Sequence, residues 1–398
     1  MSKGIYLDNA ATTPVDKKVL TSMSKYWARD FANPSSIHSM GVRAKIEVQD
    51  ARKKIAELIF GHEREIVFTS GGTESNNLAI FGVVEALLKE GKKLSDIHLI
   101  TTEIEHSSVL ECFKELQSRG CKVDYLKVDE FGIVNPKDLR ELILKNTALI
   151  SVGYANGEIG VVQPIKEIIK EIRHKRKEFG IGRIGMPYLH LDASAATLYL
   201  NMNVEELGAD MVTIDAQKIY GPKGIGVLYV RDGIGIEPMI LGGGQESGRR
   251  SGTENVPLIV GMAKAFELVE KNRIKESKRL AKIRDYFFYS IKKFVPSAII
   301  NGHLNLRLPS NINISILGQD GEMNVFRLDE EGIICSSSSA CASGTGESFV
   351  VRKIAEKTGA TKKEVDQRAK SVLRFSMGKE TKIVDIKKTL NVLANIKF

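Results

Sequence analysis

Short hydrophobic runs alternate with amphipathic segments along the chain, from about residue 43 to residue 230. Apolar runs bounded by turn residues are typical of buried strands, whereas apolar positions three and four residues apart predict helices. We expect strands at residues 65–70, 98–102, 148–154, 188–192, 211–215 and 226–230. We expect helices at residues 74–91, 107–120 and 164–180. This rhythm indicates an α/β fold, with a mostly parallel sheet covered by helices and ligands bound beyond the carboxyl ends of its strands.

The C-terminal part of the chain has a different pattern. A long helical segment is expected at residues 256–294, with apolar positions that include Met262, Ala265, Phe266, Val269 and Leu280. Strand-like runs and helical stretches are then mixed, which predicts a small α+β domain. We therefore expect a large domain at residues 15–258 and a small domain built from residues 1–14 and 259–398.

Composition and charge narrow the class of protein. The 398 residues are 42% hydrophobic and 27% charged, which is ordinary for a globular protein. No apolar run approaches the roughly 20 residues that span a bilayer, and the first residues lack the apolar core of a secretory signal. We expect a cytoplasmic protein without a membrane partner. The net charge of +9 could attract RNA or an acidic partner, but we favour a lysine-rich solvated surface because acidic residues stand close to the basic ones.

The four cysteines argue against a disulfide framework or a zinc site, since they are scattered and none forms a CxxC pair. Cys112 and Cys121 lie in or beside a helical pattern and are interpreted as small buried hydrophobic residues. We expect no resident metal ion.

Four expected strands are followed by residues that can carry chemistry. Residues 71–75, "GGTES", open a helix and can form an anion-binding site from backbone N–H groups. His106, Asp192 and Lys218 follow three further strands. Each residue alone is ambiguous. Together they suit one ligand that has a phosphate, an aromatic ring, a basic ring nitrogen and an aldehyde, which is pyridoxal 5'-phosphate (PLP).

Ordered motifs along the whole chain resemble one family. They are "YLDNAATTP", "NPSSIHSMG", "FTSGGTESNNLAI", "TEIEHSSVL", "NGEIGVVQP", "HLDAS", "KIYGPKGIGVLYV", "GGGQESGRRSGTENV", "SSSSACASG" and "VLRFSMG". The sequence resembles the cysteine desulfurases of the NifS/IscS type, within the fold type I PLP-dependent transferases. The resemblance implies a mostly parallel seven-stranded sheet, a homodimer with shared sites, and release of sulfur from L-cysteine to give L-alanine.

The resemblance also implies roles for individual residues around PLP. Lys218 would form the Schiff base and later move protons at the substrate α-carbon. Asp192 would pair with the pyridine nitrogen, and His106 would stack on the ring and serve in acid–base steps. Gly72 and Thr73 would hold the phosphate.

Further implied roles concern the substrate and the partner subunit. Thr253 would reach the phosphate in the partner subunit, while Asn156 and Arg374 would contact the substrate, with Arg374 holding its carboxylate. Cys341, in a Ser-, Ala- and Gly-rich loop, would accept the sulfur as a persulfide. It would pass the sulfur to an Fe–S scaffold protein or to tRNA-thiolation enzymes, and it could ligate an Fe–S cluster transiently. Cys335 is expected to end a strand and to be structural.

Several positions depart from the family pattern. Ala195 replaces a glutamine, Gly157 replaces an asparagine, and Ser338 stands where glycine is common. Asp215 and Gln217 replace a serine and a histidine that serve the phosphate. A carboxylate beside a phosphate is repulsive. Asp215 could be protonated, pair with a cation such as an arginine of "GRRSG", or point elsewhere while Gln217 donates to the phosphate, and we favour the last two.

Two other functions stay open at this point. A selenocysteine lyase would use the same residues. A weakened homologue that acts mainly as a binding platform for Fe–S assembly partners would explain the altered contacts. Retention of Lys218, Cys341, Arg374, Asp192 and His106 favours an active desulfurase, because a pure binding platform has no need of that full set. An aminotransferase would leave Cys341 without a task.

Overall fold

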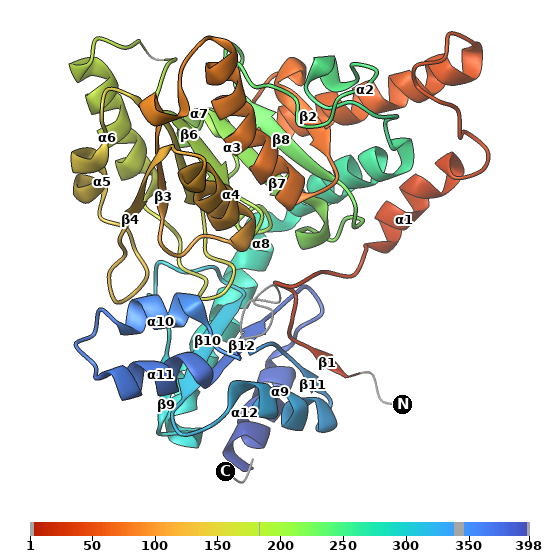
Figure 1. The fold of residues 1–398 in the computed structure, drawn as a ribbon. Helices are drawn as coiled ribbons and strands as arrows, with labels where there is room; N and C mark the ends of the chain where they lie inside the picture. The colour runs from red at the N-terminus through yellow and green to blue at the C-terminus, as the bar shows by residue number, and fades with distance from the viewer. Residues whose placement is uncertain (1–3, 183, 338–345, 396–398) are drawn as a thin grey trace.

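The computed structural model describes residues 4–182, 184–337 and 346–395. Figure 1 shows an upper lobe built around a large sheet and a lower lobe built around a small one, joined by the long helix α8. Cys341 and Ser338 lie outside the described residues.

The upper lobe contains a seven-stranded sheet with the strand order β2-β8-β7-β6-β5-β3-β4. The strands are β2 (Ile66–Thr69), β3 (His98–Thr102), β4 (Lys122–Leu126), β5 (Thr147–Gly153), β6 (Tyr188–Asp192), β7 (Met211–Asp215) and β8 (Gly226–Val230). Neighbouring strands from β4 to β7 run parallel, while β8 is antiparallel to both β2 and β7. The prediction of a mostly parallel seven-stranded sheet is confirmed.

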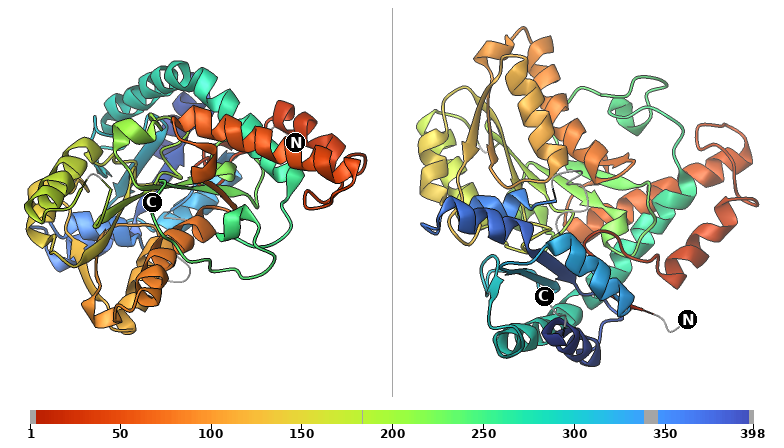
Figure 2. Two further views of the ribbon diagram at one scale, coloured as in Figure 1. Left: turned by 90° about the horizontal axis from the view of Figure 1, so that it is seen from above. Right: turned by 60° about the horizontal axis from the view of Figure 1, so that its bottom comes forward.

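Helices cover both faces of this sheet, because successive strand side chains point to opposite faces and both sets are apolar. The helices of the upper lobe are α1 (Lys17–Met23), α2 (Ser39–Ile59), α3 (Gly72–Lys89), α4 (Ser107–Ser118), α5 (Pro136–Leu142), α6 (Ile165–Glu178) and α7 (Val204–Leu207). Helices α3 and α4 share one buried core with the sheet, and α2, α6 and α8 share the other. Figure 2 shows α1 and α2, in red, on the side of the molecule away from α5 and α6.

The long helix α8 (Val256–Phe294) matches the predicted segment, and Met262, Phe266 and Leu280 are buried as expected. Its N-terminus has Asn255 as a cap, since the Asn255 side chain accepts a hydrogen bond from the backbone of Leu258. Because α8 packs against α1, α2 and α12, it links the two lobes. No helix in the described part of the chain is long and apolar enough to cross a membrane.

The lower lobe is a mixed α+β unit, as the sequence predicts. It contains the antiparallel sheet β12-β10-β9 and the parallel pair β1-β11. Its elements are β1 (Ile5–Tyr6), β9 (Ala298–Ile300), β10 (Asn311–Ile316), α9 (Gly321–Glu330), β11 (Ile333–Ile334), α10 (Phe349–Ala355), α11 (Lys362–Lys370), β12 (Val372–Ser376) and α12 (Ile383–Asn395). The pairing of β1 with β11 supports the assignment of residues 1–14 to the small domain. We propose the domain boundaries given above, with residues 15–258 in the large domain.

The described cysteines are Cys112, Cys121 and Cys335; all three are buried and form no disulfide with one another. Cys335 follows β11 directly, and burial raises the pKa of its thiol to about 12. A thiol that stays protonated at neutral pH is a poor nucleophile, in keeping with the structural role expected for Cys335.

Candidate active site

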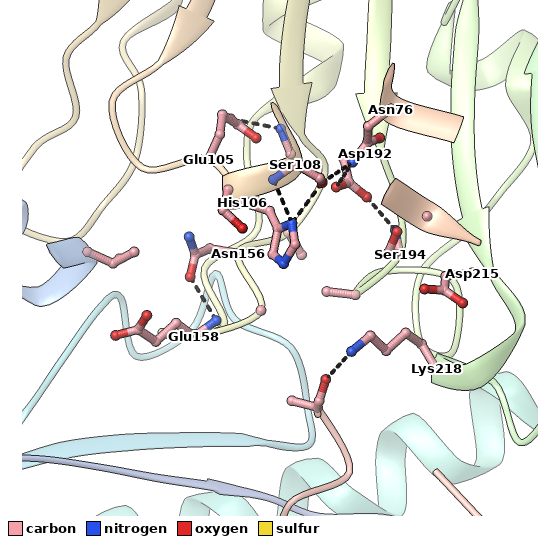
Figure 3. A pocket seen from close by; sticks show the side chains of 18 of the residues that line it. Asn76, Glu105, His106, Ser108, Asn156, Glu158, Asp192, Ser194, Asp215 and Lys218 are labelled. Carbon is pink, nitrogen blue, oxygen red and sulfur yellow. Dashed lines mark hydrogen bonds between the residues drawn. The ribbon is translucent and has the colours of Figure 1, made fainter. Parts of the chain in front are cut away.

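A cavity of about 390 Å³ lies where the carboxyl ends of the parallel strands face the lower lobe (Figure 3). The predicted site residues that line it are Gly72, Thr73, His106, Asn156, Asp192, Gln217, Lys218 and Arg374. Thr253 does not line the cavity and is exposed on the surface of this chain. Cys341 is outside the described residues.

Lys218 ends a short 3₁₀ helix (Ala216–Lys218) that follows β7. Its Nζ atom donates hydrogen bonds to the carbonyl oxygens of Ala10 and Ala11, at 2.6 and 2.7 Å. These carbonyls belong to the N-terminal segment, which crosses from the lower lobe. The amine is therefore positioned in the cavity by a segment more than 200 residues away in sequence.

Asp192 is the last residue of β6, and both its carboxylate oxygens accept hydrogen bonds. Oδ1 accepts from the backbone N–H of Ser194 at 3.0 Å, and Oδ2 accepts from Nδ2 of Asn76 at 2.8 Å. These two donors compensate for the loss of water around the carboxylate. The acid is thus fixed in place with one edge toward the cavity.

His106 is the N-cap of α4 and accepts a hydrogen bond at Nδ1 from the backbone N–H of Ser108, at 3.2 Å. The Ser108 hydroxyl lies 2.8 Å from the same Nδ1 atom. Figure 3 shows the other side of the ring, with Nε2, turned toward Lys218 and the cavity.

The N-terminus of α3, which follows β2 in the chain, forms a cradle that faces Ser194 and Asp215. Gly71 has φ of 151°, a conformation that favours glycine. Gly72 is also needed for close packing, because a Cβ there would lie 3.0 Å from Ser194 Oγ and 3.2 Å from Asp215 Oδ2. Free N–H groups at a helix start bind anions, so this cradle suits a phosphate. A buried carboxylate, Asp215, nevertheless lies beside it.

Asp215 pairs with no lysine or arginine in the described structure, which corrects the first of our two favoured accounts; the second, a hydrogen bond from Gln217 to the phosphate, stays a prediction. Its carboxylate accepts hydrogen bonds from the backbone N–H and the side-chain Nε2 of Gln217, at 3.2 and 3.0 Å, and so caps the 3₁₀ helix that ends at Lys218. Gln217 therefore donates to Asp215. Of the two arginines in "GRRSG", Arg250 donates to Glu74 at 2.9 Å and Arg249 donates to the carbonyl of Arg64 at 3.1 Å.

Glu74 is a second acid in the first turn of α3. Burial would raise the pKa of its carboxyl, but hydrogen bonds from Arg250 and Ser70 lower it overall. The ionised carboxylate interacts well with the helix N-terminus, where it competes with any bound anion.

Arg374, on β12, forms the opposite wall of the cavity. Its Nη2 atom donates to Asp8 Oδ1 at 2.9 Å and to Ser336 Oγ at 3.1 Å. Its Nε atom is buried without a hydrogen-bond partner among the described residues. Because Arg374 lines the cavity, its guanidinium is suited to pair with a carboxylate that enters it.

Asn156 has a largely structural set of contacts. Its Oδ1 atom accepts from the backbone N–H groups of Glu158 and Ile159, at 2.9 and 3.0 Å. Its Nδ2 atom donates to the carbonyl of Ile104 at 2.9 Å, which leaves one N–H for the cavity. Asn156 therefore holds the turn after β5 with three hydrogen bonds and has one N–H group left for a ligand.

Sequence reasoning missed Glu105, a buried acid that also lines the cavity. Burial raises the pKa of its carboxyl to about 7, against hydrogen bonds from the Thr102 hydroxyl and the Gly153 backbone at 2.6 and 3.0 Å. Asn76, Ser108 and Asp8 were missed as well. All three lie inside motifs that the sequence analysis quotes, but the Asp8–Arg374 and Asn76–Asp192 contacts join positions far apart in the chain.

Comparisons with known proteins identify the family of this chain. Residues 5–389 match the family model described as Aminotransferase class-V. A curated cysteine desulfurase IscS from Dictyoglomus turgidum is 43% identical over 397 residues, covering 100% of this chain and 95% of that protein.

Two solved structures extend the agreement to the fold. A NifS-like protein superposes with a TM-score of 0.87 at 32% identity, covering 99% of both chains. A structure of SspA in complex with cysteine superposes with a TM-score of 0.76 at 34% identity, covering 94% of this chain and 98% of that one. The chain belongs to the class-V aminotransferase family and, within it, to the cysteine desulfurases of the NifS/IscS type.

Proposed function

We propose that this chain uses PLP to remove sulfur from L-cysteine, giving L-alanine and a persulfide on Cys341. The observation that carries the proposal is the convergence of an amine, an acid and an imidazole on one wall of the cavity, with Arg374 on the other. An amino-acid substrate that lies between the walls would have its amino end near Lys218 and its carboxylate near Arg374.

The residues present fit PLP. The aldehyde would meet Lys218, the ring nitrogen would meet Asp192, and the phosphate would lie at Gly72 and Thr73, where a Cβ on Gly72 would intrude on the cradle. His106 would lie against the ring, and Gln217, which lines the cavity and donates to Asp215, would lie at the phosphate end. When bound, PLP withdraws electrons from the substrate α-carbon and makes its bonds labile.

The side chains of this chain would divide the remaining work. Arg374 would bind and orient the substrate carboxylate with its guanidinium, which lines the cavity. Lys218 would move a proton at the α-carbon, guided by the carbonyls of Ala10 and Ala11. His106 would provide a hydrogen bond through Nε2, which faces the same space.

Cys341 would take the sulfur. Its thiolate would attack the substrate sulfur, so that an S–S bond forms, the C–S bond breaks, and the electron pair stays with the carbon that becomes the alanine methyl group after protonation. The buried, protonated Cys335 is unsuited to this step.

A homodimer is part of the proposal. Large apolar side chains gather on α1, α2 and the segment between them, and they are exposed in the single chain: Leu20, Trp27, Phe31, Ile37, Val42 and Ile46. Ile37 is 98% exposed and Trp27 is 60% exposed. Apolar patches of this kind mark protein–protein interfaces. A second copy on this side would cover the patch and could bring Thr253, exposed here, to its partner's phosphate site.

We further propose that the persulfide is passed to an Fe–S scaffold or to a tRNA-thiolation enzyme, that Cys341 could ligate an Fe–S cluster transiently, and that the protein works in the cytoplasm. The name IscS of its relatives supports the first of these acceptors.

The function is tested by measuring alanine and sulfide from L-cysteine and dithiothreitol with PLP-saturated protein. Wild type and Cys335→Ser should both release alanine, whereas Cys341→Ser should release almost none and carry no persulfide. Equal alanine release by Cys341→Ser and wild type would contradict the mechanism. The same assay with L-selenocysteine separates a selenocysteine lyase, which would retain that activity in Cys341→Ser.

A further inference from the structure

Four side chains form a hydrogen-bonded chain from Asp192 to His106 (Figure 3). Nδ2 of Asn76 donates both to Asp192 Oδ2 and to Ser108 Oγ, each at 2.8 Å. Ser108 Oγ in turn lies 2.8 Å from His106 Nδ1. Asn76 and Ser108 are buried, with exposed fractions of 1% and 9%.

The direction of each hydrogen bond between Asp192 and His106 follows from the charge of Asp192. An ionised carboxylate only accepts hydrogen bonds, so Asn76 must turn its NH2 group toward it. The same NH2 group then supplies the hydrogen bond to Ser108 Oγ. The Asn76 oxygen, which points the other way, is buried without a partner among the described residues, and this cost shows that the amide orientation is imposed by Asp192.

The Ser108 hydroxyl links Asn76 to His106. Since its oxygen accepts the Asn76 proton, its own proton is free to point at His106 Nδ1. The backbone N–H of Ser108 independently donates to the same nitrogen at 3.2 Å. Two donors facing Nδ1 leave no room for a proton there, so a neutral His106 must carry its proton on Nε2.

We propose that Asn76 and Ser108 are positioning residues that transmit the charge of Asp192 to His106 and hold its imidazole as the Nε2–H tautomer. His106 then presents a proton donor to the cavity. A neutral ring in this form cannot accept a proton at Nε2, which leaves proton removal at the α-carbon to Lys218. The tautomer follows from the hydrogen bonds alone, whereas its use as a proton donor rests on the proposed function.

The tautomer can be observed directly by ¹⁵N NMR of the full-length protein labelled on the histidine ring, with and without PLP. Spectra are recorded at about pH 8.5, where neutral imidazoles dominate, and the His106→Gln variant identifies the signals by their loss. We expect a protonated Nε2 and an unprotonated Nδ1 in the wild type. A proton on Nδ1 would overturn the proposal.

Two variants test whether the hydrogen bonds through Asn76 and Ser108 set the tautomer of His106. In Asp192→Asn, the residue at 192 can donate, so Asn76 can turn its oxygen toward Ser108 and draw the hydroxyl proton away from His106. We expect the ratio of Nδ1–H to Nε2–H tautomers of His106 to rise about tenfold. That change corresponds to the loss of one hydrogen bond, from the Ser108 hydroxyl to Nδ1. Ser108→Ala should move the ratio in the same direction, and it serves if Asp192→Asn folds poorly.

The matched control is Asp215→Asn. It makes the same chemical change in the same cavity, but Asp215 takes no part in the hydrogen bonds that join Asp192 to His106. It should leave the His106 signals unchanged. A shift as large as that of Asp192→Asn, or no shift in both Asp192→Asn and Ser108→Ala, would overturn the proposal. Because no turnover is needed, this result is independent of the alanine assay that tests the proposed function.

Discussion

Arg374 donates a hydrogen bond to Asp8 at 2.9 Å, although the two residues are 366 positions apart. Ser336, which also donates to Asp8 at 2.8 Å, joins the pair. The Arg374 side chain is 4% exposed and the Asp8 side chain is 17% exposed. The N-terminal segment thus neutralises and orients the guanidinium on the cavity wall, and it supplies the two carbonyls that hold Lys218.

The first prediction concerns this pair. Asp8→Ala should lower the free energy of unfolding by about 2–3 kcal/mol, because it leaves a buried guanidinium without its counter-charge. Asp8→Asn keeps a hydrogen-bond acceptor for Arg374, so its free energy of unfolding should fall by clearly less than that of Asp8→Ala. Urea denaturation of both variants checks the order, and equal stability of Asp8→Ala and wild type would contradict it.

The second prediction concerns the substrate carboxylate. Arg374→Lys should raise the KM for L-cysteine about 10- to 100-fold with a smaller change in kcat, since an ammonium group cannot pair with two carboxylate oxygens in the planar geometry of a guanidinium. Steady-state alanine production measures both constants. Arg368→Lys changes a side chain that donates to Asn301 and does not line the cavity, so its KM should match wild type.

The third prediction concerns the phosphate cradle. Asp215→Ser should tighten PLP binding at least about tenfold, because it removes a buried negative charge next to the anion site. Serine can still cap the 3₁₀ helix that ends at Lys218. Fluorescence titration of the cofactor-free protein gives the dissociation constant.

Pyridoxal, which lacks the phosphate, is the control ligand for Asp215→Ser. Its affinity should be the same for the variant and the wild type. If pyridoxal binding improved as much as PLP binding, the carboxylate would be acting on the ring and not on the phosphate.

The fourth prediction concerns Glu105 and pH. Folding raises its pKa from 4.5 to about 7, so the folded protein keeps a proton that the unfolded chain releases between these values. The stabilisation is complete below pH 4.5 and is lost as pH rises through about 7, by about 3 kcal/mol at most.

Glu105→Gln keeps an oxygen for Thr102 and Gly153 and cannot ionise, so it should lose less stability than wild type between pH 5 and pH 8. Urea denaturation at both pH values gives the difference. Glu111→Gln, which changes an exposed acid on α4, should follow the wild-type profile. Parallel profiles for Glu105→Gln and wild type would show that Glu105 is not the titrating group.

Some elements were predictable because their signal is local. The buried strands of the sheet and α8 were predicted near their observed ends, since apolar periodicity and flanking glycines act within a few residues. Strand β4 and helices α1, α2 and α5 were among the elements that were not identified. β4 pairs with one neighbour only, at the edge of the sheet, and exposes Lys122, so its pattern is weaker than that of the central strands.

The amino-acid sequence alone determined the fold class, the family and the strand ends that carry His106, Asp192 and Lys218, because these follow from short-range patterns and ordered motifs. Only the tertiary structure decided how those side chains are held. It placed Asp8 on Arg374, turned Gln217 toward Asp215, paired Arg250 with Glu74, and joined Asp192 to His106 through Asn76 and Ser108. The reason is physical: hydrogen-bond partners at a site are chosen by distance and desolvation, and most of these partners are far apart along the chain.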